Sequence, residues 1–217
     1  MSASSLELLS VVKRLPRLAL ALGLVGASFA STSSGATAEQ SARTELSHLT
    51  VRAESHASTY SRTRFKSWID ADHDCEDTRA EVLKNESSVP VTQASTCRVV
   101  TGRWWSLYDG VTMTDASGLD IDHVVALAET WRSGAWAWTD NRRMSYANDL
   151  AHSQTLRAVT ASTNRSKGDS DPTDWLPPRY ASWCRYAEEW IHVKYVWSLS
   201  ADSGEVSKLK SMLNSCP

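Results

Sequence analysis

The spacing of hydrophobic and polar positions changes several times along the chain, and each spacing predicts a different element. Between Ala181 and Leu199, apolar residues recur every three or four positions, which predicts an amphipathic helix. Asp202, followed by Glu205 three residues later, forms a variant capping box that opens a last helix ending at Leu213. The C-terminal part of the chain is therefore predicted to be helical.

The first half of the chain predicts helices followed by a β-rich segment. Residues 46–68 are compatible with one or two short helices, and residues 74–87 predict a helix with Asp74 as its cap. Residues 97–110 alternate and are rich in β-branched and aromatic side chains. We therefore expect a strand or hairpin there, ending at the turn signal Asp109-Gly110.

Two short segments further on predict a pair of strands. GLDIDHVV at 118–125 and TLRAVT at 155–160 each read as one strand, and the second half of the insertion between them is expected to be helical. STNRSKGD at 162–169 follows the second strand, with Ser162 or Thr163 as the expected helix cap. The resulting order of helices, β-rich segment, strand–loop–strand–helix and two last helices predicts an α+β fold.

The N-terminus has the pattern of a secretory signal. Three basic residues precede the apolar run Leu18–Ala30, which is shorter than the about 20 residues that a spanning helix needs. Small residues predict cleavage after Ala30 or Ala38, so we predict that residues 1–38 are a signal peptide and short polar leader, with residues 31–40 disordered. Residues 39–217 would then be one secreted domain without stable membrane association, and an uncleaved anchor is the alternative.

The formal charge limits how this chain can bind a polyanion. The leader holds three basic residues, Lys13, Arg14 and Arg17, and one acid, Glu7, so its removal changes the net charge from −2 to −4. The secreted part is therefore not a polycation. Binding of nucleic acid must use a local patch or a metal ion.

Four cysteines all fall in the part predicted to be exported. An even number in an oxidising compartment favours two disulfides, for which three pairings exist. Cys75–Cys97 and Cys184–Cys216 each bracket a local unit and close a short loop, so we predict this pairing. A zinc cluster is the rival, but no two cysteines have the usual zinc-knuckle spacing.

Asp122 and His123 stand together at the end of the first predicted strand. A neutral histidine is suited to take a proton from water, and a hard divalent ion held by carboxylate and amide oxygens is suited to a phosphodiester and its leaving oxygen. Asn164 opens the predicted helix after the second strand. If the two strands pair and this helix packs across them, Asn164 lies beside Asp122.

The segments DIDHVVALAETW, YANDL, TLRAVTASTNRSKGD and DW together resemble the HNH endonucleases, in the secreted branch allied to the C-terminal domain of GmrSD-type restriction enzymes. The resemblance implies a ββα-metal core at about 118–170, surrounded by helices and a small β-rich segment and stapled by disulfides. It implies that His123 is the general base and that Asp122 and Asn164 bind one divalent ion, Mg²⁺ first, with Mn²⁺ or Zn²⁺ as alternatives.

Basic residues near this motif are candidate contacts to the substrate. Arg165 and Lys167 are predicted to bind phosphate. Four further arginines are candidates for a DNA-facing ridge: Arg132, Arg142, Arg143 and Arg157.

The sequence thus predicts a secreted, metal-dependent endonuclease that cleaves nucleic acid, with DNA favoured over RNA. Low sequence specificity is expected because no separate DNA-reading module is visible. No protein partner is evident from the sequence. The alternative is a non-catalytic secreted binding module in which the Asp122–His123 turn is structural.

Overall fold

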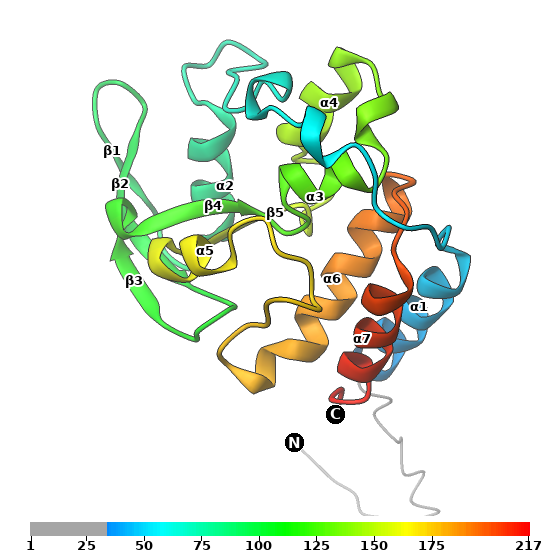
Figure 1. Cartoon of the computed structure of the whole chain (residues 1–217). Helices are drawn as coiled ribbons and strands as arrows, with labels where there is room; N and C mark the ends of the chain where they lie inside the picture. The colour runs from blue at the N-terminus through cyan, green and yellow to red at the C-terminus, as the bar shows by residue number, and fades with distance from the viewer. Residues whose placement is uncertain (1–33) are drawn as a thin grey trace, which may run out of the picture. The chain divides into compact units, whose positions relative to one another are not determined.

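Helices and two small antiparallel sheets alternate along residues 34–217, the part of the chain that this computed structural model describes (Figure 1). The α+β prediction is confirmed by this order. Within the described part, no helix is both long and apolar enough to cross a membrane. The predicted cleavage after Ala30 lies outside the described residues.

Helix α1 (Ser34–His48) corrects the prediction that residues 31–40 are disordered, because helix begins at Ser34. The apolar face of α1 explains why this segment forms a helix. Ala42 and Leu46 are buried in the same core cluster as residues of helix α6, against which α1 packs. Cleavage after Ala38 would fall within this helix. Both cleavage positions stay predictions.

The C-terminal helices match the sequence pattern closely. Helix α6 (Trp183–Val196) and helix α7 (Ser203–Leu213) lie beside α1 (Figure 1). The capping box is present: the Asp202 carboxylate accepts a hydrogen bond from the Glu205 backbone, and the Glu205 side chain accepts one from the Asp202 backbone. Fully buried apolar side chains, including Trp190 and Leu209, fill the space between these helices.

The β-rich segment forms a three-stranded antiparallel sheet in the order β1-β2-β3. Its strands are β1 (Thr92–Gln93), β2 (Val99–Trp105) and β3 (Thr112–Asp115). Helix α2 (Thr78–Glu86) packs against β2 and against β5 of the second sheet. Around their shared interface lies a second buried cluster that includes Leu83, Trp104 and Ile121.

Asp77, and not Asp74 as predicted, caps α2, because the Asp77 carboxylate accepts the Ala80 backbone N–H. Asp74 instead accepts the N–H of Glu76 in the preceding turn. Cys75 has a φ of 77°, so the chain cannot continue as helix from Asp74. This error of three residues reflects turn chemistry that hydrophobic spacing does not report.

Both predicted disulfides are present. Cys75–Cys97 joins the turn before α2 to the loop between β1 and β2, with a sequence separation of 22. Cys184–Cys216 joins the start of α6 to the C-terminus, with a separation of 32. Each bridge therefore closes a local unit, as the spacing predicted.

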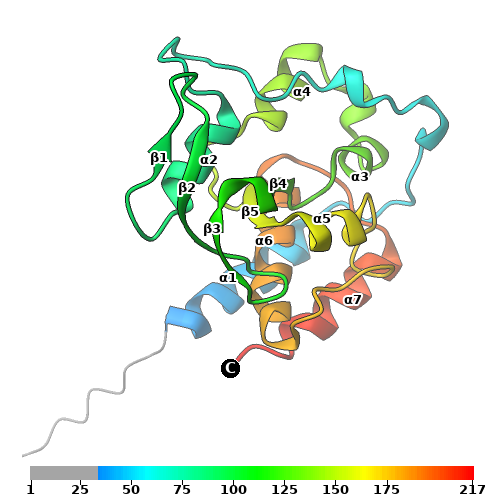
Figure 2. The ribbon, with the colours of Figure 1, turned by 90° about the vertical axis from the view of Figure 1, so that its left-hand side faces the viewer.

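The second sheet is a two-stranded antiparallel pair followed directly by a helix. Strands β4 (Leu119–His123) and β5 (Leu156–Thr160) pair from Leu119↔Thr160 to His123↔Leu156. Helix α5 (Ala161–Lys167) packs on both strands, and Figures 1 and 2 show it beside them. The predicted strand–loop–strand–helix order is confirmed.

Helix α5 begins earlier than predicted. No loop separates it from β5: Thr160 ends the strand and is also the residue before the helix, so Ser162 and Thr163 are not caps. Asn164 therefore lies one turn inside α5 instead of at its first residue. The insertion between the strands forms α3 (Leu127–Arg132) and α4 (Asp140–Ala147), so its second half is helical as expected.

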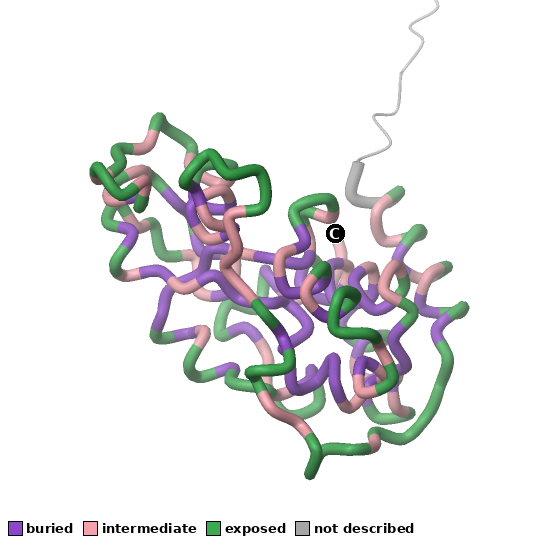
Figure 3. The backbone as a smooth tube through the Cα atoms, turned by 90° about the horizontal axis from the view of Figure 1, so that it is seen from above, coloured by how far each residue is buried: buried purple, intermediate pink, exposed green. Residues whose placement is uncertain are grey.

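The alternation of β4 separates the core from the polar residues. Leu119 and Ile121 belong to the buried cluster beneath α2, whereas Asp120 and Asp122 contact side chains of α5. Val124 and Val125, just after the strand, enter the helical core. Buried positions accordingly run through the centre of the described chain in Figure 3, with exposed loops outside them.

Candidate active site

His123, Asp122, Asn164 and Arg165 line one cavity of about 330 Å³ between β4 and α5. The antiparallel pairing of β4 and β5 and the direct start of α5 bring these residues together across a sequence gap of about 40 positions. Tyr60 and Arg62, from the segment before α2, also line this cavity. The predicted base and both predicted metal ligands thus share a single cavity.

His123 is buried, with 5% of its surface exposed, and its ring is held in one orientation. Nε2 lies 3.1 Å from the Ala147 carbonyl oxygen, which can only accept, so Nε2 carries the proton. Nδ1 then has a lone pair, with no hydrogen-bond partner among residues 37–217. Burial lowers the pKa of His123 to about 4, so the imidazole is neutral at physiological pH.

Asp122 is buried and both of its carboxylate oxygens are hydrogen-bonded. Lys167 Nζ donates to Oδ1 at 2.8 Å, and the Tyr108 hydroxyl donates to Oδ2 at 2.5 Å. Lys167 also donates to the His123 carbonyl oxygen at 2.9 Å, so one ammonium holds the backbone of the base and the neighbouring carboxylate. Burial raises the pKa of Asp122, and Lys167 and Tyr108 oppose that shift.

The prediction that Lys167 contacts phosphate is wrong, because its side chain is 0% exposed. Lys167 is the last residue of α5, and Gly168, with a φ of 59°, ends the helix there. The side chain points inward, where it neutralises a buried carboxylate that would otherwise lack a counter-charge. Arg165, by contrast, is 75% exposed and remains available to a phosphate.

Asn164 is oriented by Asp120. The Asn164 Nδ2 group donates to Asp120 Oδ2 at 3.2 Å, which leaves the amide oxygen Oδ1 free. Arg165 Nε lies 3.9 Å from the same carboxylate oxygen. Asp120, on strand β4, therefore orients the Asn164 amide of helix α5.

These groups fit one hard divalent ion. A carboxylate has about four lone-pair positions, and the Asp122 carboxylate accepts hydrogen bonds from Tyr108 and Lys167, so it retains acceptor capacity. The Asn164 amide oxygen is the second donor in the same cavity. An all-oxygen set of this kind suits Mg²⁺ or Mn²⁺ better than Zn²⁺, which prefers nitrogen and sulphur.

Tyr108 is a site residue that sequence reasoning missed. It lies directly before the Asp109-Gly110 turn, and this turn is tied to the start of α5 because the Asp109 carboxylate accepts the Thr163 hydroxyl at 2.7 Å. Tyr108 is fully buried, so its hydroxyl is held against Asp122. The Asp109-Gly110 turn signal beside Tyr108 is visible in the sequence, but the contact between Tyr108 and Asp122 is not.

The predicted DNA-facing ridge of arginines is not formed. Arg157 pairs with Glu189, Arg132 pairs with Glu54 at 2.8 Å, and the buried Arg143 pairs with Asp140. Arg142 donates to the Trp197 carbonyl at 2.8 Å. These guanidinium groups stabilise the fold instead of presenting free charge.

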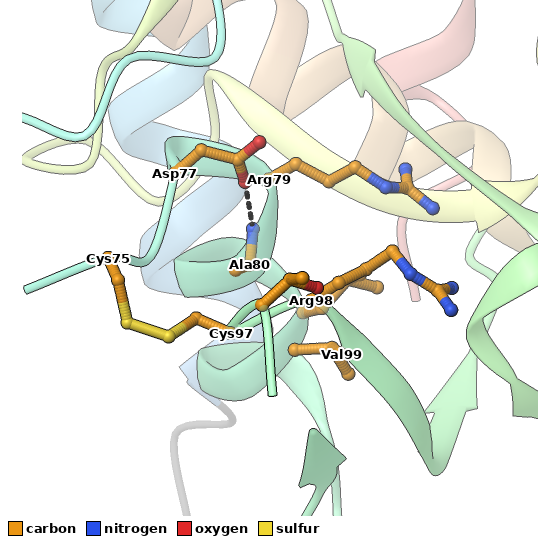
Figure 4. A pocket seen from close by; sticks show the side chains of 9 residues that line it. Cys75, Asp77, Arg79, Ala80, Cys97, Arg98 and Val99 are labelled. Atoms are coloured by element: carbon orange, nitrogen blue, oxygen red, sulfur yellow. Dashed lines mark hydrogen bonds between the residues drawn. A yellow bond between two sulfur atoms is a disulfide. The ribbon is translucent and has the colours of Figure 1, made fainter. Parts of the chain in front are cut away.

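A second cavity, of about 230 Å³, lies beside the Cys75–Cys97 disulfide (Figure 4). Its carboxylate, Asp77, caps α2 by accepting the Ala80 N–H. Arg79 is bound to the backbone carbonyls of Ala116 and Leu119. The lining of this cavity includes no histidine and its carboxylate is engaged in capping α2, so we do not take it as the candidate active site.

Comparison with known proteins agrees with this geometry. The family model of the GmrSD restriction endonucleases, C-terminal domain, matches residues 74–205, which include β4, β5 and α5. A protein of Arthroderma benhamiae described as an uncharacterized secreted protein is 46% identical over 175 residues, covering 81% of this chain and 84% of that protein. No solved structure matches the chain.

The matched family points, at a coarse level, to a nuclease or hydrolase acting on nucleic acid. The two disulfides fit an extracellular location, as does the description of the Arthroderma protein. The match covers more than half of the chain and includes all three predicted site residues. The chain therefore belongs to the family of GmrSD restriction endonuclease C-terminal domains.

Proposed function

We propose that this protein is a secreted, metal-dependent endonuclease of the HNH type that hydrolyses phosphodiester bonds with low sequence specificity. The observation that carries the proposal is the shared cavity. A neutral imidazole with a free Nδ1 lies beside a carboxylate and an amide oxygen, all on a strand pair and its following helix. DNA is the favoured substrate.

His123 is proposed to be the general base through Nδ1. The Ala147 carbonyl keeps the proton on Nε2, and it stabilises the imidazolium that forms when Nδ1 accepts a proton from water. The pKa of about 4 belongs to the cavity without substrate. A pKa well below neutral keeps the imidazole in the neutral form, which is able to accept a proton.

Asp122 and Asn164 are proposed to hold one divalent ion. Such an ion, when bound, neutralises charge on the phosphate and stabilises the leaving oxygen. Lys167 and Tyr108 keep the Asp122 carboxylate in one orientation, and Asp120 does the same for the Asn164 amide. Because Lys167 also holds the His123 carbonyl, the base and the carboxylate are positioned by one buried group.

Low specificity and secretion are further parts of the proposal. Three of the four arginines predicted to form a ridge, Arg132, Arg143 and Arg157, are paired with carboxylates, so the ridge offers little free positive charge for reading a sequence. The N-terminal signal pattern and the two disulfides support export.

The test is cleavage of supercoiled plasmid with Mg²⁺, with and without EDTA. The parent protein should nick plasmid only with the metal, and His123→Ala should lower the rate about 100-fold or more. His48→Ala is the matched control. His48 is exposed at the end of α1, so this variant should cleave plasmid at the rate of the parent. Equal rates for His123→Ala and the parent would show that the base is wrongly assigned.

The alternative is a non-catalytic secreted binding module. It predicts that the parent protein retains plasmid in a mobility-shift assay but does not cleave it with Mg²⁺, Mn²⁺ or Zn²⁺. Retention without metal-dependent cleavage would therefore favour this second function.

A further inference from the structure

Arg62 lies in the short 3₁₀ helix η2 (Arg62–Arg64) and lines the same cavity as His123 and Asn164. It precedes the family match, which begins at residue 74. We propose that Arg62 is a substrate-binding residue that holds a phosphate of the nucleic acid backbone over the catalytic cavity. This inference rests on the proposed nuclease function.

Arg62 is available to a ligand because no protein acid occupies it. Its side chain is exposed, and none of the ion pairs among the described residues includes it. The other cations near the cavity are engaged: Lys167 by Asp122, and Arg165 more loosely by Asp120. Arg62 is therefore the cation lining the described cavity that has no carboxylate within ion-pair distance.

The charges around the cavity point to an anionic occupant. Asp122 is neutralised by Lys167, Asp120 faces Arg165, and Asp169 shares Arg132 with Glu54. Arg62 adds a positive charge that has no carboxylate at ion-pair distance among the described residues, and such a charge attracts a phosphodiester. A guanidinium donates two parallel hydrogen bonds to phosphate oxygens, and it does not compete for a metal ion as a carboxylate would.

The segment that carries Arg62 is anchored on both sides. Before it, the Trp131 indole N–H donates to the His56 carbonyl at 3.0 Å. After it, Phe65 is buried with 3% exposed, and the Ile69 N–H donates to the Asn148 side chain at 3.2 Å. The chain between these anchors is held at the cavity, so little backbone freedom is lost when Arg62 binds a ligand.

The test compares Arg62→Gln and Arg62→Lys with Arg64→Gln as the matched control. Arg64 is an exposed neighbour that stacks on Trp131 at 5.1 Å and does not line the cavity. With plasmid and Mg²⁺, Arg62→Gln should lower kcat/KM about 10- to 100-fold, the loss expected for hydrogen bonds between charged groups. Arg62→Lys should recover part of this loss, and Arg64→Gln should stay within about twofold of the parent.

Salt dependence separates phosphate binding from a structural role. Arg62→Gln should make the plot of log kcat/KM against log salt concentration shallower by about 0.9, the contribution of one phosphate contact to duplex DNA. Thermal unfolding should change little, because Arg62 is exposed and forms no ion pair with another described residue. If Arg62→Gln nevertheless melts earlier, Arg62→Lys carries the test, since it keeps the charge and lacks the planar fork.

The outcomes distinguish this inference from the proposed function. If the parent cleaves, His123→Ala does not, and Arg62→Gln matches the parent in rate and salt slope, the inference is overturned while the nuclease assignment stands. If the parent shows no metal-dependent cleavage, the proposed function fails, and the assignment of Arg62 fails with it.

Discussion

Replacement of Lys167 by methionine tests whether a buried ammonium neutralises Asp122. Lys167 is fully buried and Asp122 is 5% exposed, and their side chains are 2.8 Å apart. Methionine approximately keeps the volume and removes the charge, so the Asp122 carboxylate is left buried with the Tyr108 hydroxyl as its hydrogen-bond donor. The perturbation therefore creates one uncompensated charge in the core of the site.

The expected cost follows from this geometry. Loss of one partner of a buried ion pair costs about 3 to 5 kcal/mol, because the desolvated charge remains. Loss of the bond to the His123 carbonyl adds to this cost. For a chain of this size, each kcal/mol lowers the melting temperature by about 2 to 4 °C, so Lys167→Met should melt about 6 to 20 °C lower.

Thermal unfolding followed by circular dichroism, with disulfides intact, is the assay. Lys210→Met on the exposed face of α7 is the control and should change the melting temperature by about 2 °C or less. The double variant Lys167→Met/Asp122→Leu should recover much of the loss, because it removes both charges. A single variant that loses under about 1 kcal/mol, or a double variant no better than the single, would refute the reasoning.

Two further predictions concern stability. Burial raises the pKa of Glu205 to about 7, with Lys194 opposing, so the folded state binds this proton more tightly than the unfolded state, whose pKa is 4.5. Its stabilising contribution is then complete below pH about 4.5 and is lost as pH rises through about 7, so Glu205→Gln should reduce the pH dependence of the urea midpoint between pH about 4.5 and about 7. Removal of the second disulfide as Cys184→Ser/Cys216→Ser opens a loop with a sequence separation of 32 and should cost about 3 to 4 kcal/mol in urea unfolding. An unchanged midpoint in the disulfide variant, or a pH profile of Glu205→Gln equal to that of the parent, would contradict these expectations.

Periodic and local signals were sufficient for the elements that carry the site. The strands at β4 and β5 and the capping box of α7 were predicted because alternation and cap chemistry act over a few neighbouring residues. The cap of α2 was misplaced to Asp74, since the positive φ at Cys75 interrupts the helix and hydrophobic spacing does not report it. Local patterns therefore predict the presence and type of an element better than the residues at which it begins and ends.

The sequence by itself determined the α+β order, the disulfide pairing and the set of chemical groups at Asp122, His123 and Asn164, because these depend on spacing along the chain. Only the tertiary structure decided which cations line the candidate cavity. The Lys167 side chain points inward to a buried carboxylate. Arg62 lies in a segment about 60 residues before His123, and no sequence pattern connects that segment to the motif. A charged side chain is exposed or buried according to the partners that folding brings within a few ångströms, and those partners are distant in sequence.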